Sequence, residues 1–172
     1  MTNTLVFIHG LESTSQGTKG QFFRINFSQM IVEDYFGGFN ERMQKLAKLL
    51  AGKDNLILVG SSYGGLMAAQ YALQNEHRVR KMILLAPALM LPEFTPEAGK
   101  QLNIPVTIYH GTEDDVVDPY LVKSIAEKVF RRLEHHLVSD DHSLTKTFPS
   151  LNWGKYLRKN CPLVPCDVLS SP

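Results

Sequence analysis

The decisive stretch of this sequence is Leu56-Ile57-Leu58-Val59-Gly60-Ser61-Ser62-Tyr63-Gly64-Gly65, a short apolar run followed by the pattern Gly-x-Ser-x-Gly. The apolar run predicts a buried strand, and the Leu-, Met- and Ala-rich residues 65–74 predict a buried helix. A serine between such elements sits on a strained turn that projects its hydroxyl above the sheet edge. We therefore expect Ser62 to be a nucleophile. The backbone N–H of Tyr63 lies at the first turn of the helix, where it can stabilise a developing negative oxygen.

Two other readings of this pattern are a loop that only turns the chain and a phosphate-binding loop. The second is disfavoured because no Lys-Ser or Lys-Thr pair follows the glycines. The flanking strand and helix favour a nucleophile over a simple loop, because the turn requires both of them.

Along the rest of the chain, short apolar runs alternate with longer segments of helical periodicity, which is typical of βαβ units. Strands are expected over residues 5–8, 28–32, 56–59, 82–86, 106–110 and 133–138. Helices are expected from an Asn40 cap to a stop at Gly52, and over residues 65–74, 120–131 and 149–159. The fold class is therefore α/β, with about six mainly parallel strands in a three-layer arrangement and helices on both faces.

The length of 172 residues predicts one domain over residues 1–159, followed by an irregular, proline-rich tail over residues 160–172. The two cysteines, Cys161 and Cys166, both fall in that tail and are expected to be bystander thiols. A formal net charge of +1 gives no broad field to hold a polyanion, so nucleic-acid binding is not expected.

No run approaches the ~18 apolar residues that a membrane span needs, so no membrane association is expected. The first apolar run, Leu5-Val6-Phe7-Ile8, is too short for a signal peptide and lacks a basic flank. The expected location is the cytoplasm. The oligomeric state is left open.

A serine nucleophile needs a base, and the base needs an orienting acid. The expected strand 106–110 leads into Glu113-Asp114-Asp115, and the expected strand 133–138 leads into a loop that contains His142. Carboxylates and an imidazole thus follow two strands of the same sheet. The order Ser, Asp, His along the chain is that of one known triad topology.

Four motifs in this order, Phe7-Ile8-His9-Gly10, residues 60–65, residues 110–114 and Asp141-His142, resemble the α/β-hydrolase superfamily. The similarity spans Thr4 to Phe148. The small size and the stretch from Ser13 to Lys19 resemble the compact bacterial esterases of the YqiA type within it.

The resemblance implies a role for each matching residue. Ser62 would be the nucleophile, His142 the general base and then acid, and Asp114 the carboxylate that orients it. Leu11, which follows His-Gly, would give the second N–H of an oxyanion hole beside Tyr63. The chain departs from the full-length fold because it lacks the antiparallel strands before His-Gly and has little room for a cap.

Other polar residues near these motifs have simpler explanations. The His-Gly-x-x-Asp spacing selects Asp114 over Asp115, and Asp118 is expected to cap the helix that begins at Pro119. His9 and His110 each precede a glycine at a strand end, where backbone and loop geometry account for them.

A metal site is not expected either. The adjacent His135 and His136 point to opposite faces of a strand, so they cannot bind one ion together. Ligand spacing with Asp140, Asp141 and His142 is also poor.

The substrate pocket is the least specified part of the site. Residues 88–100 lie where this superfamily often inserts a lid, and their length allows only a flap. With neighbouring apolar residues they would wall a modest pocket for a short acyl chain, although ordinary core packing explains the same residues equally well. The residues proposed for this pocket are Met90, Leu91, Phe94, Val116 and Val117.

The sequence as a whole predicts a serine hydrolase that cleaves small carboxylic esters or thioesters through an acyl-enzyme, without a cofactor. The expected partner is a small ester or thioester. Two alternatives stay open. One is amide or peptide cleavage by the same triad, and the other is a non-catalytic ligand-binding or scaffold protein with the same fold.

Overall fold

The computed structural model describes residues 3–157, which contain a six-stranded sheet with the order β2-β1-β3-β4-β5-β6. All neighbouring strands are parallel. The strands are β1 (Thr4–Ile8), β2 (Ile31–Val32), β3 (Leu56–Ser61), β4 (Val79–Leu85), β5 (Leu102–Gly111) and β6 (Phe130–Val138). Because the strands are parallel, the loops that follow β1, β3, β5 and β6 all leave the same edge of the sheet.

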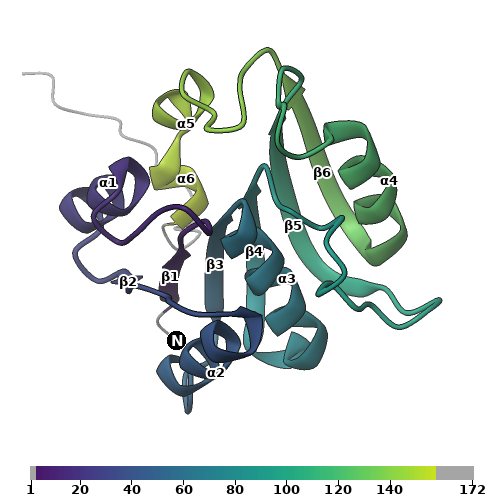
Figure 1. Cartoon of the computed structure of the whole chain (residues 1–172). Coiled ribbons are helices and arrows are strands. Elements are labelled where there is room, and N and C mark those ends of the chain that lie inside the picture. Colours follow the sequence, from purple (N-terminus) through teal and green to yellow (C-terminus); the bar gives the residue numbers. More distant parts are fainter. Residues whose placement is uncertain (1–2, 158–172) are drawn as a thin grey trace, which may run out of the picture.

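Helices cover both faces of this sheet, as predicted (Figure 1). The helices are α1 (Thr18–Asn26), α2 (Phe39–Leu49), α3 (Tyr63–Gln74), the 3₁₀ turn η1 (Glu76–Arg78), α4 (Pro119–Val129), α5 (Thr147–Ser150) and α6 (Trp153–Leu157). Helices α2, α3 and α4 pack on one face, and α1, α5 and α6 pack on the other. None of the described helices is both long enough and apolar enough to cross a membrane.

The central strand β3 shows why the strands are apolar throughout. Leu56 and Leu58 belong to the core under α2, α3 and α4, whereas Ile57 and Val59 belong to the core under α1, α5 and α6. All four side chains are fully buried. A strand covered on both faces cannot alternate with polar residues, which explains the run that identified it.

Several helix boundaries differ from the sequence prediction by a few residues, and two of them have a clear physical cause. Helix α2 is capped by Gly38 instead of Asn40, because the Glu41 carboxylate accepts the Gly38 backbone N–H at 2.5 Å and stabilises the earlier start. Helix α4 ends at Val129 instead of residue 131, because Phe130 already pairs with Leu102 at the start of the long β5–β6 ladder.

The C-terminal helix prediction was only partly correct. The expected helix over 149–159 is divided into α5 and α6, because Leu151 adopts an extended conformation with φ −69° and ψ 138°. Residues 158 and 159, the predicted tail over 160–172 and both of its cysteines lie outside the described residues.

Helix α1 is an element that the sequence did not predict, and the strand predicted over 28–32 is reduced to the two residues of β2. The helix begins after Gly17 without a side-chain cap and contains Gly20, so it carries no start signal and weak propensity. Its stability comes from tertiary packing. The Phe23 ring is fully buried, with ring centroids 4.9 Å from both Phe7 and Trp153.

The packing of Phe23 gives a direct test of this part of the core. We expect Phe23→Ala to lower the free energy of unfolding by about 3–5 kcal/mol, because it leaves a cavity between α1 and the sheet. Phe36→Ala is the control, since that ring is 68% exposed, and should change stability by less than about 0.5 kcal/mol. Urea unfolding measures both, and equal losses would contradict the assigned packing.

Candidate active site

Ser62 lies on the turn between β3 and α3, as the sequence predicted, and caps the helix with φ +53° and ψ −117°. This left-handed conformation is unfavourable for a residue with a side chain and persists only where its surroundings enforce it. Its N–H donates to Leu85 O at 2.8 Å, and its carbonyl accepts N–H groups from Gly65 at 2.9 Å and Ala88 at 3.1 Å. The neighbouring strand and helix therefore hold the turn from both sides.

Close backbone packing explains why the motif has a glycine at position 64. A Cβ atom on Gly64 would lie 2.1 Å from the carbonyl oxygen of Ile8, a separation that no side chain permits. This contact brings α3 against the end of β1. On the other side of the turn, a Cβ on Gly10 would be 3.3 Å from the Cβ of Ser62, so the loop after β1 lies directly against the serine.

Ser62, His142 and Asp114 form one hydrogen-bonded chain, although they are far apart in the sequence. His142 Nε2 is 3.0 Å from Ser62 Oγ, and His142 Nδ1 is 2.7 Å from Asp114 Oδ2. Because a carboxylate can only accept hydrogen bonds, Nδ1 carries the ring proton and donates a hydrogen bond to Asp114. The lone pair of Nε2 is then free to accept from the serine hydroxyl, which is the arrangement a general base requires.

Asp114 is held by hydrogen bonds on both of its oxygens. Oδ1 accepts the N–H groups of Val116 at 2.9 Å and Val117 at 2.8 Å, while Oδ2 faces His142 and His110. Burial of this fully enclosed side chain raises the pKa of the carboxyl. The hydrogen bonds from Val117, His142 and Val116 outweigh that effect, and the pKa is lowered overall. The carboxylate therefore stays charged beside the imidazole.

The loop that carries His142 is built around the buried Asp140. Its Oδ2 accepts the N–H groups of Lys146 at 3.1 Å and Thr147 at 2.7 Å. The loop is also tied to the segment after β1, because Lys19 Nζ donates to Ser143 O at 2.6 Å. The imidazole is thus positioned from two parts of the chain.

His110 and His9 have closer roles at the site than the sequence predicted. His110 Nε2 lies 3.0 Å from Asp114 Oδ2 and 3.1 Å from Val117 O, so its N–H supports the carboxylate. His9 accepts the Tyr35 N–H at Nε2 (2.9 Å), and its Nδ1 donates to Gly10 O (2.7 Å). Burial is the largest influence on both imidazoles and lowers their pKa values. The only sequence signal was their position before a glycine.

The two oxyanion-hole candidates come from two different elements near Ser62. Tyr63 is the first residue of α3, and Leu11 follows Gly10 in the turn after β1. The Leu11 side chain is 48% exposed, and its carbonyl oxygen is 3.5 Å from Nη2 of Arg42. Sequence reasoning did not single out Arg42.

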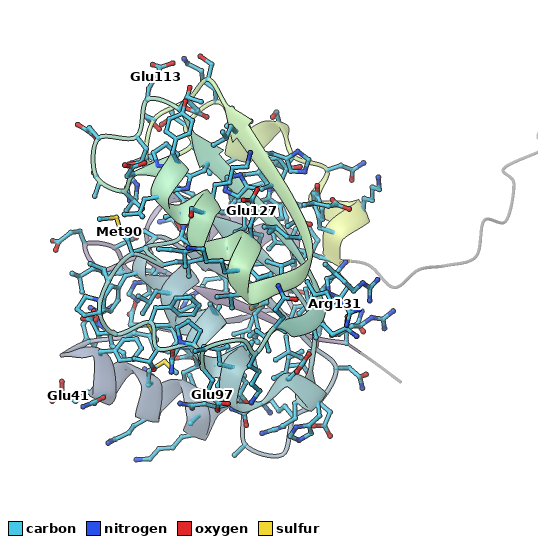
Figure 2. The ribbon with its side chains drawn as sticks, turned by 90° about the vertical axis from the view of Figure 1, so that its right-hand side faces the viewer. Glu41, Met90, Glu97, Glu113, Glu127 and Arg131 are labelled. Carbon is cyan, nitrogen blue, oxygen red and sulfur yellow. The ribbon has the colours of Figure 1, made fainter. Side chains whose placement is uncertain are left out.

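The five residues proposed for the substrate pocket do not share one environment. Phe94 and Val117 are buried in the core with α3 and α4, and Leu91 packs against it. Met90 and Val116 are exposed, and Met90 lies at the surface in Figure 2. Phe94 and Val117 therefore fit ordinary core packing better than a role in a substrate pocket.

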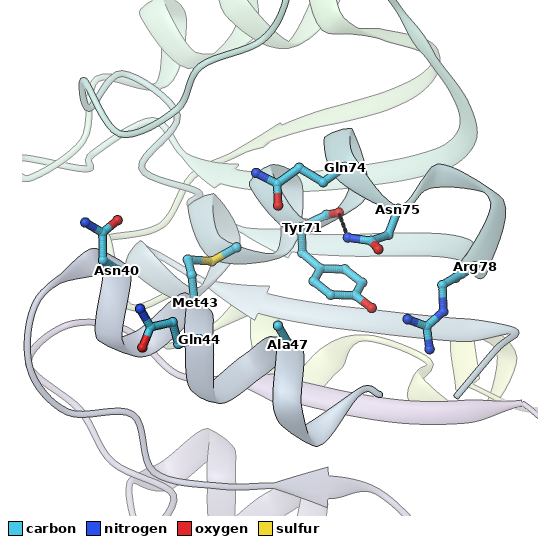
Figure 3. Close-up of a pocket in the computed structure, with 8 residues that line it drawn as sticks. All are labelled: Asn40, Met43, Gln44, Ala47, Tyr71, Gln74, Asn75 and Arg78. Carbon is cyan, nitrogen blue, oxygen red and sulfur yellow. Dashed lines mark hydrogen bonds between the residues drawn. The ribbon is translucent and has the colours of Figure 1, made fainter. Parts of the chain in front are cut away.

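Two cavities lie away from the serine. One, of about 370 Å³, lies between α2 and α3 (Figure 3). It is lined by Asn40, Met43, Gln44, Ala47, Tyr71, Gln74, Asn75 and Arg78. The other, of about 270 Å³, lies over β4 and β5 beside Tyr156. Neither contains Ser62, Asp114 or His142.

Within residues 3–157, no three His, Cys, Asp or Glu side chains are arranged to hold a metal ion. His135 and His136 point to opposite faces of β6, as predicted. His136 stacks on Tyr109 with ring centroids 4.6 Å apart, whereas the His135 ring is tilted against His110 at 6.4 Å.

Comparison with known proteins identifies the family. Residues 14–102, just over half of the chain, match the model of the α/β hydrolase fold family, and the chain belongs to this family. A curated relative, acyl-protein thioesterase 1 homolog 2 of Dictyostelium discoideum, is 35% identical over 68 residues. That match covers 38% of this chain and 30% of the relative, so the chain matches less than a third of the relative's length.

Solved structures share the fold at low sequence identity. Mouse alpha/beta hydrolase domain-containing protein 10 superposes with a TM-score of 0.70 at 20% identity, covering 84% of this chain and 83% of that protein. A monoacylglycerol lipase from Paleococcus ferrophilus gives 0.68 at 15% identity, covering 89% and 91%. These similarities do not single out the YqiA-type esterases.

We expect His135 to make a pH-dependent contribution to the free energy of unfolding. Both of its ring nitrogens are buried without a partner, and burial, followed by the nearby His110, lowers its pKa from 6.5 to about 4. Between these values the unfolded chain binds a proton that the folded chain does not. The free energy of unfolding should therefore fall as the pH decreases from about 6.5 to about 4.

We expect His135→Leu to reduce this acid-induced loss. The loss should remain in His136→Gln, because the His136 ring is exposed. Urea unfolding at pH 7 and pH 5 makes the comparison, and an identical loss in wild type and His135→Leu would show that His135 is not the responsible group.

Proposed function

We propose that this chain is a serine hydrolase that cleaves small carboxylic esters or thioesters through a Ser62–His142–Asp114 triad. The observation that carries the proposal is the continuous hydrogen-bonded chain from Ser62 Oγ through His142 to Asp114. Membership of the α/β hydrolase family supports it. The name of the Dictyostelium relative, a thioesterase homologue, supports including thioesters among the substrates.

The proposed reaction begins when His142 Nε2 takes the proton of Ser62 as Oγ attacks the substrate carbonyl. The tetrahedral oxyanion forms beside the N–H groups of Tyr63 and Leu11, which stabilise it. His142 then gives the proton to the leaving alcohol or thiol, and an acyl-Ser62 ester remains. A water molecule activated by the same imidazole hydrolyses this ester and restores the enzyme.

The electrostatics of the proposed triad favour this sequence of steps. When His142 accepts the serine proton it becomes an imidazolium, and the buried Asp114 carboxylate lies 2.7 Å from its Nδ1. Because the pKa of Asp114 is lowered, the carboxylate stays charged and stabilises that cation. No metal or cofactor takes part in the proposed reaction.

The neighbouring serines provide the test of the nucleophile. Ser62→Ala should remove essentially all turnover of p-nitrophenyl acetate while leaving the melting temperature close to that of wild type, because only the attacking oxygen is lost. Ser61→Ala is the matched control and should retain activity, since Ser61 is the last residue of β3. Activity that survives in Ser62→Ala and disappears in Ser61→Ala would refute the assignment. A protein inactive in every form would favour the non-catalytic alternative.

The role of Asp114 as the orienting acid is tested by comparing it with Asp118, a second aspartate four residues further along the chain. Asp114→Asn should reduce kcat by several orders of magnitude, roughly 10⁴-fold by comparison with the best-studied triad, because the imidazole loses its orienting partner. Asp118 accepts the N–H groups of Tyr120 and Leu121 as the cap of α4. Asp118→Asn should keep both activity and stability, because Asn caps a helix as well as Asp does. Similar losses in the two variants would leave Asp114 without a specific role.

A further inference from the structure

Arg42 is a buried cation without a carboxylate partner in the described part of the chain. It lies in α2, only 5% exposed, and its Nε donates to Gly37 O at 2.9 Å. Its Nη2 makes one long contact of 3.5 Å to Leu11 O, and its Nη1 is buried with no hydrogen-bond partner. A guanidinium has five N–H donors, so several of them remain unused here.

The position of this cation connects it with the proposed active site. The guanidinium carbon lies 5.6 Å from the ring centroid of Tyr63, and Nη2 faces the carbonyl of Leu11. These are the two residues whose N–H groups we assign to the oxyanion hole. Arg42 therefore contacts both of the residues proposed for the oxyanion hole.

A second side chain with an unpartnered atom, Glu93, lies at the hydroxyl end of Tyr63. The Tyr63 hydroxyl donates to Glu93 Oε1 at 3.3 Å, and Glu93 Oε2 is buried without a partner. Glu93 belongs to the irregular segment 88–100 that follows β4. Burial raises the pKa of the Tyr63 phenol, Glu93 adds to this rise, and Arg42 opposes it, so both charges act on the same ring.

A buried guanidinium without a counter-ion is unfavourable, because the interior does not replace its hydration. Two backbone carbonyls and the face of an aromatic ring compensate only in part. A carboxylate would satisfy the unused donors with the planar, two-pronged geometry that arginine favours. Because Glu93 does not supply this contact, the missing anion can come from a ligand.

We propose that Arg42 is a specificity-determining residue that binds a carboxylate carried by the substrate. The chain would thus favour esters or thioesters that bear a carboxylate a few atoms from the scissile carbonyl. Nη1 is buried in this structure, so binding of the substrate carboxylate requires a local movement that exposes this atom. The inference rests on the proposed function, because it assigns the substrate class of that site.

The test compares two p-nitrophenyl esters with five-carbon acyl chains. Mono-p-nitrophenyl glutarate ends in a carboxylate, and p-nitrophenyl valerate ends in a methyl group. The measured quantity is the ratio of their kcat/KM values. We expect wild type to prefer the glutarate ester and Arg42→Gln to lower the ratio by roughly 10- to 100-fold, the usual effect of losing a hydrogen bond to a charged group. Arg42→Lys should keep part of the preference for the glutarate ester, because it keeps the positive charge.

A second pair of esters places the carboxylate on the leaving group, as 4-carboxyphenyl valerate against phenyl valerate. A lower ratio for this pair in Arg42→Gln would support the inference with the carboxylate on the alcohol side. The matched control is Lys45→Gln, which removes one positive charge from the same helix. Lys45 pairs with Glu33 at 3.8 Å and is 41% exposed. Both ratios should remain unchanged in this variant.

Glu93→Gln tests the same inference without altering Arg42. Removing this negative charge, which would repel a substrate carboxylate near Tyr63, should raise the preference for the carboxylate-bearing ester severalfold. If Arg42→Gln reduced kcat/KM equally for charged and neutral esters, Arg42 would only support Leu11 and Tyr63, and the inference would be overturned. A wild type with Ser62-dependent turnover and no preference in either pair would also overturn it. Turnover that does not depend on Ser62 would overturn the proposed function itself.

Discussion

The geometry of the site depends on the buried carboxylate of Asp114. Its Oδ1 accepts two N–H groups of its own loop, and its Oδ2 contacts His110 from β5 and His142 from the loop after β6. One carboxylate therefore connects two neighbouring strand ends and sets the orientation of the imidazole. These four contacts keep a fully buried charge in place that would otherwise be strongly unfavourable.

A second constraint acts at Ser62, where a left-handed conformation is kept by close packing of β1 and α3. Such strain costs about 1–3 kcal/mol and needs a rigid frame to enforce it. The parallel sheet provides that frame, because β3 is central and buried on both faces. Hydroxyl and imidazole are thus positioned by different elements of one sheet, and the segment after β1 contacts both of them.

Much of the fold and the candidate site could be predicted because the signals were local. The apolar run before Ser62 identified β3, and the motif spacing placed Asp114 and His142 after the correct strands. The predictions failed where contacts between distant parts of the chain determine the local structure. Helix α1 has no cap and is stabilised by Phe23 packing against distant rings. The environment of Arg42 arises from Leu11 and Tyr63, which lie 31 and 21 residues away, so no local pattern could reveal it.

The central claim is that Ser62 is a nucleophile activated by His142, and covalent labelling tests it most directly. The protein would be treated with a fluorophosphonate, digested, and mapped by mass spectrometry with fragmentation that separates Ser61 from Ser62. The account predicts one adduct, on Ser62, and much slower labelling in His142→Gln. An adduct on another residue, or labelling that is unaffected by the loss of His142, would contradict it.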